Sequence, residues 1–162
     1  FKRVQDLNGE SSANSGLHIH VNRNVFKGNN ELAKIIRFVE NNFDTLMLLA
    51  CRTNEDSNWC QKYGMTVKEL SQIYTVAKDE NEKYRAINLC PSHTVEFRMF
   101  RSTQDVERIH AYIQFVDVIT DLANMNSIRY IGWSNIARIA KNKKYIELRN
   151  VLQKTGLLKE AK

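Results

Sequence analysis

The stretch GLHIHV, residues 16–21, places two of the chain's four histidines on alternate positions of a short apolar run. In a β-strand successive side chains point to opposite faces. The aliphatic residues then share one face: Leu17, Ile19 and Val21. His18 and His20 share the other face, about 7 Å apart along the strand. The run therefore predicts a strand over about 17–22 with one apolar and one imidazole-bearing face.

The stretch TVEFRMF, residues 94–100, has the same two-faced design. Its apolar face consists of Val95, Phe97 and Met99. Its other face carries Thr94, Glu96, Arg98 and Phe100. A short turn with the chain's single proline, residues 91–93, separates it from YRAINLC, residues 84–90. This arrangement predicts a hairpin of strands 84–90 and 94–100.

Apolar residues at helical spacing predict that most of the remaining chain is helical. The predicted helices span about 31–49 and 66–77, then a long helix between the cap at Ser102 and a connector at 126–133, then 134–141 and 144–154. Expected caps are Asn29 or Asn30 for the first, Thr66 with Glu69 for the second, and Ser102 with Asp105 for the third. The apolar stripe of the third helix is Val106, Ile109, Ile113, Val116, Ile119 and Ala123. Because no βαβ units alternate, the pattern favours an α+β fold, a largely antiparallel sheet with helices packed on one face.

Composition fits one globular domain, residues 1–162, of which 43% are hydrophobic and 26% charged. No apolar run approaches the roughly 18 residues of a membrane helix, so no membrane partner is expected. Three cysteines without CxxC spacing indicate reduced thiols and a cytoplasmic location. The net charge of +6 serves either solubility or an anionic ligand.

The polar faces of the two strands could meet on one surface if both strands lie in the same sheet. Carboxylate and imidazole groups bind divalent cations, and a guanidinium grips phosphate oxygens in a fork. His18, His20, Glu96 and Arg98 therefore predict a site for a metal and a nucleoside triphosphate. The alternative is a solvated sheet face without function, which antiparallel sheets often have.

Three motifs in this order, NSGLHIHVNR, KYRAINL and TVEFRMFRST, resemble the amidoligases, which are carboxylate–amine ligases related to glutamine synthetase and glutamate–cysteine ligase. The resemblance covers about residues 14–103. It implies a glutamine-synthetase-like catalytic domain that uses ATP and Mg²⁺. A substrate carboxylate would take the γ-phosphate to form an acyl phosphate, and an amine would displace phosphate to leave an amide or isopeptide bond.

The resemblance also implies roles for individual residues. His18 and Glu96 would be metal ligands, and His20 would contact an ATP phosphate. Arg98 would bind and stabilise the transferring phosphoryl group. Arg85 would assist at a phosphate or at the substrate carboxylate, and Asn88 would line the substrate site. Since residues 85 and 88 are three apart, a regular strand would turn them to opposite faces, unless a bulge intervenes.

Family members carry acidic metal ligands on a strand that precedes the GxHxHV motif. Here the acidic residues before Gly16 are Asp6 and Glu10, in a polar, loop-like stretch. We therefore expect the chain to be the C-terminal portion of a longer amidoligase-like domain, with an N-terminal segment supplying further ligands.

Two other functions remain open from the residues alone. A non-catalytic module could bind a phosphate-bearing partner through its net positive charge. Few aromatic and basic residues alternate on any predicted strand, which counts against a nucleic-acid partner. A zinc hydrolase could use His18, His20 and Glu96 as three ligands with one open position.

Overall fold

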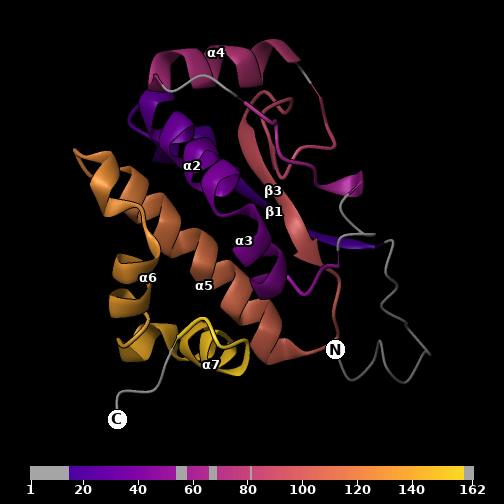
Figure 1. The fold of residues 1–162 in the computed structure, drawn as a ribbon, viewed down its shortest axis with the longest axis vertical. Coiled ribbons are helices and arrows are strands. Elements are labelled where there is room, and N and C mark those ends of the chain that lie inside the picture. The colour runs from indigo at the N-terminus through magenta and orange to yellow at the C-terminus, as the bar shows by residue number, and fades with distance from the viewer. Residues whose placement is uncertain (1–14, 54–57, 66–68, 81, 159–162) are drawn as a thin grey trace.

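The computed structural model describes residues 15–53, 58–65, 69–80 and 82–158 (Figure 1). Its strands are β1 (Gly16–Asn22), β2 (Ile87–Asn88) and β3 (Thr94–Arg101). Its α-helices are α2 (Asn29–Asn41), α3 (Phe43–Leu49), α4 (Leu70–Glu80), α5 (Val106–Ala123), α6 (Trp133–Ile139) and α7 (Ile146–Lys154). Short 3₁₀ turns lie after β1 (Arg23–Val25), after α5 (Ile128–Tyr130) and after α6 (Lys143–Tyr145).

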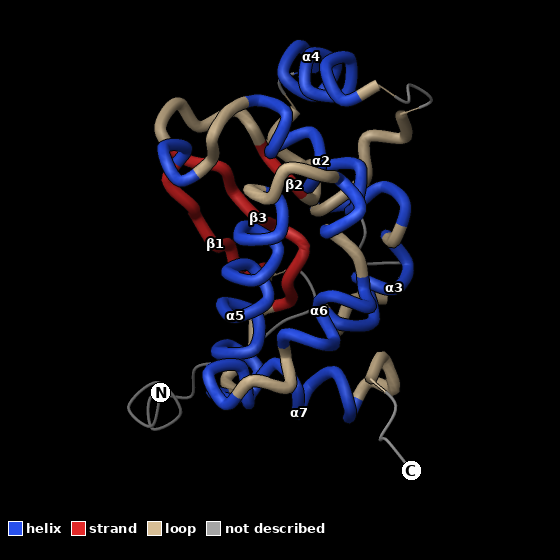
Figure 2. Tube along the Cα trace, turned by 90° about the vertical axis from the view of Figure 1, so that its left-hand side faces the viewer, coloured by secondary structure: helices blue, strands red, loops and turns tan. Residues whose placement is uncertain are grey.

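The three strands form one antiparallel sheet in the order β1-β3-β2, so β3 is central and pairs with both neighbours. Helices α2, α3 and α5 lie on one side of the strands (Figures 1 and 2). The α+β prediction, with an antiparallel sheet and helices on one face, is confirmed. Of the predicted hairpin, β3 spans the expected residues, but β2 is only two residues long.

A β-bulge in β3 changes which side chains enter the core. Leu17 pairs with Phe100 and Ile19 with Phe97, so two residues of β3 lie opposite the single residue His18. An extra residue reverses the alternation beyond it. Phe100 was expected beside Glu96 on the polar face, and that prediction is wrong. It is fully buried.

Phe100 instead joins the core between the sheet and α5. Its ring stacks on that of Tyr112, with centroids 4.4 Å apart, and meets Phe115 edge-on at 6.3 Å. This packing ties the end of β3 to the longest helix and leaves the opposite face of the sheet to polar groups.

The predicted helix 31–49 is two helices because Asn42 interrupts it. Asn42 leaves helical geometry, with φ −125° and ψ 21°. Its side-chain amide donates to the Phe38 carbonyl at 2.8 Å and accepts from Trp133 Nε1 at 3.0 Å. A side chain that bonds the local backbone and a distant indole competes with helix continuation. The predicted Asn29 or Asn30 cap is also wrong, since the helix begins at Asn29 and Gly28 occupies the cap position.

Helix α5 begins at Val106, after Asp105, whose carboxylate accepts from the Arg108 amide. Asp105 is thus the cap, and the predicted box with Ser102 does not form. The buried face of α5 differs from the predicted stripe because Val106 and Ile113 are exposed. The helix is instead buried through Ala111, Tyr112, Phe115, Val116, Val118, Ile119, Thr120, Leu122 and Ala123.

The segment before α4 is held by one carboxylate. Glu40 accepts hydrogen bonds from the amides of Tyr63, Gly64 and Met65 at 2.6, 2.8 and 3.2 Å. Helix α4 continues to Glu80, beyond the predicted end at 77, and the predicted Thr66 cap lies outside the described residues.

The chain ends in α6 and α7, close to the predicted ranges, and Gly156 with φ +74° follows the last helix as expected of a glycine C-cap. All three cysteines are free thiols. In the part of the chain that the structure describes, no helix has the length and apolar character needed to span a bilayer.

Candidate functional site

Glu96, in the middle of the central strand, is the hub of a polar group on the sheet face opposite the helices. It is only 5% exposed. Its Oε1 accepts from His18 Nδ1 and from Arg98 Nη1, each at 2.8 Å. Its Oε2 accepts from Asn88 Nδ2 at 2.5 Å. A buried carboxylate is tolerated because donors from all three strands neutralise and bond it.

Strand register explains this convergence. His20 and Asn88 lie directly opposite Glu96, one on each flanking strand. Directly opposed residues of an antiparallel pair share a face and touch. His20 Nε2 is 3.7 Å from Glu96 Oε1, and its Nδ1 is 3.0 Å from the Thr94 hydroxyl.

The β3 bulge positions Arg98 in this group. Arg98 and Met99 together face His18, so the guanidinium folds back along the strand onto Glu96. The Arg98 side chain is 14% exposed and lies 5.8 Å from the centre of the Tyr84 ring. Its Nε is buried and has no hydrogen-bond partner.

Arg85 does not join the group. Its guanidinium forms an ion pair with Glu80 at 2.9 Å and donates to the Lys62 carbonyl at 2.8 Å. It also lies over the Tyr63 ring, 5.3 Å from the centroid. Arg85 lies outside β2, so of these two residues only Asn88 reaches Glu96. Asp6 and Glu10 lie outside the described residues.

Arg52 is a member of the group that sequence patterns did not reveal. It follows α3 in a stretch without periodicity, so nothing in its spacing linked it to the strands. It is 6% exposed, and it donates from Nε to the Met99 carbonyl at 2.8 Å and from Nη2 to the Phe100 carbonyl at 3.1 Å. A Cβ added to Gly16 would lie 2.9 Å from both Arg52 Nη2 and His18 Nε2, so these two nitrogens are close together.

Burial and neighbouring charges lower the pKa of His18. Burial lowers the pKa of His18 below its ordinary value of 6.5, and the charges of Arg98, His20 and Arg52 lower it further, against the opposing effect of Glu96. The 2.8 Å contact between His18 Nδ1 and Glu96 Oε1 raises the pKa of His18, but by less than burial and the neighbouring cations lower it. Arg98 Nη1 lies 3.4 Å from the same nitrogen because both groups donate to Glu96 Oε1.

We expect His18 to titrate below pH 6.5 in the folded chain. The unfolded chain then binds the proton more readily, so the free energy of unfolding falls as the pH is lowered from 6.5 through the folded pKa. NMR titration of the His18 ring measures the pKa directly. Arg98→Gln should raise this pKa and Glu96→Gln should lower it further. A folded pKa at or above 6.5 would contradict the description.

The donor set suits phosphate more fully than it suits a cation. Two guanidinium groups and two imidazoles surround one carboxylate, so oxyanions find several donors. Among the described residues, no three histidine, cysteine, aspartate or glutamate side chains are grouped as a metal site. Glu96 Oε2 accepts a hydrogen bond from Asn88 and has a second lone pair for a metal ion. His18 contacts Glu96 through Nδ1, which leaves its Nε2 as a metal ligand. Mg²⁺ is commonly held by one or two carboxylates with substrate phosphates and water, so these residues fit a cation that arrives with phosphates.

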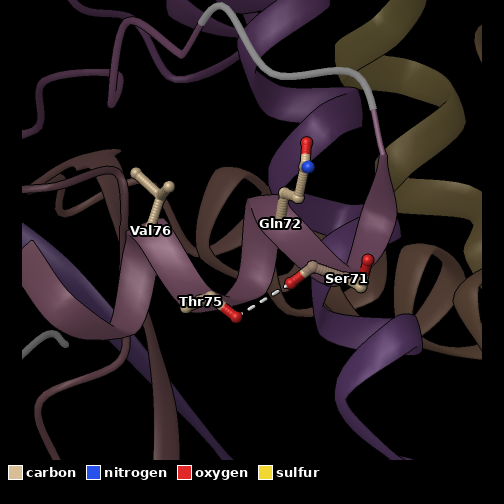
Figure 3. A pocket seen from close by; sticks show the side chains of 4 residues that line it. All are labelled: Ser71, Gln72, Thr75 and Val76. Atoms are coloured by element: carbon tan, nitrogen blue, oxygen red, sulfur yellow. Dashed lines mark hydrogen bonds between the residues drawn. The ribbon is translucent and has the colours of Figure 1, made fainter.

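Surface hollows lie on α4 and beside α3. A hollow of about 400 Å³ on α4 is lined by Ser71, Gln72, Thr75 and Val76, where Thr75 Oγ1 donates to the Ser71 carbonyl (Figure 3). None of the group's residues lines it. A second hollow of about 560 Å³ beside α3 is lined by Asp44, Thr45, Met47, Leu48, Arg52 and Thr53, and so reaches the group through Arg52.

Comparison with known proteins identifies the family of the chain. No curated protein and no solved structure matches the chain. The family model described as "putative amidoligase enzyme" matches residues 5–120, which include all three strands and every residue of the polar group. The match covers most of the chain and supports a ligase-type enzyme. The chain belongs to this amidoligase family.

Proposed function

We propose that the chain is an ATP-dependent carboxylate–amine ligase that works through an acyl phosphate. The observation that carries the proposal is the Glu96 hub, which brings Arg98, His18, His20 and Asn88 together on one sheet face. A sheet face that is merely solvated would not require a buried carboxylate that accepts hydrogen bonds from all three strands. A zinc hydrolase would give Arg98 no necessary role.

ATP would supply the phosphoryl group that a substrate carboxylate oxygen accepts, with ADP leaving; the amine nitrogen then attacks the acyl carbon, loses a proton and expels phosphate. The chain's own residues act on charge and orientation in this scheme. Arg98 offers donors to phosphate oxygens as their charge develops, and its geometry is set in advance by Glu96 and the bulge. His20, the more exposed imidazole, is placed to donate to a second phosphate oxygen.

Glu96 and His18 are the residues that would hold Mg²⁺, and the ion would neutralise charge on the phosphate oxygens. Glu96 also keeps Arg98 and His18 oriented through its Oε1. Asn88, bonded to Glu96 by its amide nitrogen and to the Cys90 amide by its oxygen, forms the β2 border of the group and is placed to line the substrate site. The localisation that fits ATP-dependent chemistry is the cytoplasm.

A hydroxylamine trap tests the proposal without knowledge of the natural amine. The chain is incubated with ATP, Mg²⁺, hydroxylamine and a panel of amino-acid, peptide and cell-wall-type carboxylates. We expect carboxylate-dependent release of ADP and phosphate together with a hydroxamate, because hydroxylamine displaces phosphate from an acyl phosphate. Omission of each component, and the Glu96→Gln variant, serve as controls.

Other outcomes would point elsewhere. ATP hydrolysis that no carboxylate stimulates, without hydroxamate, would contradict the acyl-phosphate scheme. Tight stoichiometric zinc with peptide or ester hydrolysis would favour the hydrolase. Salt-sensitive nucleic-acid binding without any ATP turnover would favour the non-catalytic module.

A further inference from the structure

Arg52 is a buried cation without a charge partner in the described residues. It is 6% exposed, and its contacts are two backbone carbonyls at the end of β3. No ion pair joins it to a carboxylate of the described chain, and its Nη1 is buried without any hydrogen-bond partner. Buried charges in proteins are normally paired, so an uncompensated guanidinium indicates an anion that completes it.

The position of Arg52 relative to His18 shows where that anion would bind. Arg98 Nη1 approaches the Nδ1 end of the His18 ring at 3.4 Å. Arg52 Nη2 and the Nε2 end of the same ring flank one point beside Gly16, each 2.9 Å from it. Two guanidinium groups thus lie at opposite ends of one imidazole, and each has a buried nitrogen without a partner.

The absence of a Cβ at Gly16 lets both side chains pack against this point. Any larger residue would place its Cβ against both the guanidinium of Arg52 and the ring of His18. Those two groups are held in place, Arg52 by its carbonyl bonds and His18 by Glu96. Two donor-bearing side chains therefore meet at the start of β1, because residue 16 has no Cβ.

We propose that Arg52 is a second phosphate-binding arginine, which together with Arg98 holds the phosphate oxygens of a polyphosphate across His18 and above Gly16. This inference rests on the proposed function and deepens it. It assigns to the loop after α3 a direct contact with the nucleotide phosphates. The backbone bonds of Arg52 make it preorganised, because its fork is oriented before any anion arrives.

Titration calorimetry with sodium tripolyphosphate tests the assignment on the whole chain. A charge-assisted contact contributes about 1.5–3 kcal/mol, so Arg52→Gln should weaken binding by about 10- to 100-fold. Arg52→Lys should lie between, since it keeps the charge and loses the fork. Gly16→Ala should weaken binding, because its Cβ would displace Arg52 Nη2 and the His18 ring from their positions.

Arg23→Gln is the matched control. Arg23 is also a partly buried arginine that donates to two backbone carbonyls, those of Leu89 and Pro91. Within the described residues it forms no hydrogen bond or ion pair with Glu96, His18 or Arg98. Its loss should change the tripolyphosphate affinity by less than about twofold. Equal weakening by Arg23→Gln and Arg52→Gln would reduce the Arg52 effect to general charge or stability and overturn the assignment.

A measurement on the unmutated chain guards against variants that fail to fold. The Arg52 Nε–H, bonded to the Met99 carbonyl, should give a ¹⁵N NMR resonance that is absent in Arg52→Lys. Tripolyphosphate should shift it, whereas acetate at equal ionic strength should not. A shift with acetate alone would assign Arg52 to the substrate carboxylate and overturn the phosphate assignment.

If Arg98→Gln abolishes tripolyphosphate binding and Arg52→Gln does not weaken it, the proposed function stands and this inference fails. If the unmutated chain binds no tripolyphosphate, both fail.

Discussion

Arg98→Gln is expected to lower kcat for hydroxamate formation by about 10²- to 10³-fold, the usual loss when a preorganised donor to developing charge is removed. Glutamine keeps a polar group of similar reach but has no charge and no fork. The ground state also changes, because Glu96 loses one of the donors at its Oε1. The measurement is steady-state release of ADP and hydroxamate under saturating ATP.

The same assay separates catalysis from folding. Arg98→Lys restores the charge without the planar fork and should recover only part of the activity. Arg23→Gln, which removes an arginine of the 3₁₀ turn after β1, should keep kcat near that of the unmutated chain. If Arg98→Gln retains more than about a tenth of the activity, Arg98 does not contact the reacting phosphoryl group.

Phe100→Ala is expected to lower the free energy of unfolding by about 3–5 kcal/mol, the cost of removing a large aromatic side chain from a packed core. Phe100 is fully buried and stacks on Tyr112, so its loss opens a cavity between β3 and α5. Urea unfolding followed by circular dichroism measures the change. A marginally stable domain could be largely unfolded by it, so the experiment begins at low temperature.

Ile113→Ala provides the comparison for this core prediction. Ile113 belongs to the predicted apolar stripe of α5, but its side chain is 49% exposed in the structure. Its replacement should change the free energy of unfolding by no more than about 0.5 kcal/mol. A loss below about 1 kcal/mol for Phe100→Ala would show that Phe100 lies on the solvated face, as simple alternation suggested, and that β3 has no bulge.

Period-two alternation was sufficient to place His18, His20 and Glu96 on one sheet face. His18, His20 and Glu96 point as their spacing requires because β1 is regular through them and β3 is regular up to Glu96. The same rule failed at Phe100, since the bulge at Arg98 and Met99 inserts a residue that no local pattern announces. A bulge is stabilised by its surroundings, here by the Arg52 bonds to the carbonyls of Met99 and Phe100.

The helix predictions failed where a distant partner changed the local preference. Asn42 ends α2 because its amide finds Trp133 and the Phe38 carbonyl. The exposed side of α5 includes Val106 and Ile113, while Tyr112 and Phe115 reach the Phe100 ring instead. In each case a contact across the core outweighed the propensity of a short segment.

The sequence by itself determined the α+β class, the amidoligase resemblance and the four polar residues of β1 and β3, because strand alternation and motif order are local properties of the chain. Only the tertiary structure decided that Glu96 is the shared hub, that Asn88 joins it while Arg85 pairs with Glu80, and that Arg52 lies against Gly16 and His18. Those outcomes depend on strand register, a bulge and a loop that crosses the end of β3. Each is set by contacts between residues far apart in the chain, which no window of sequence contains.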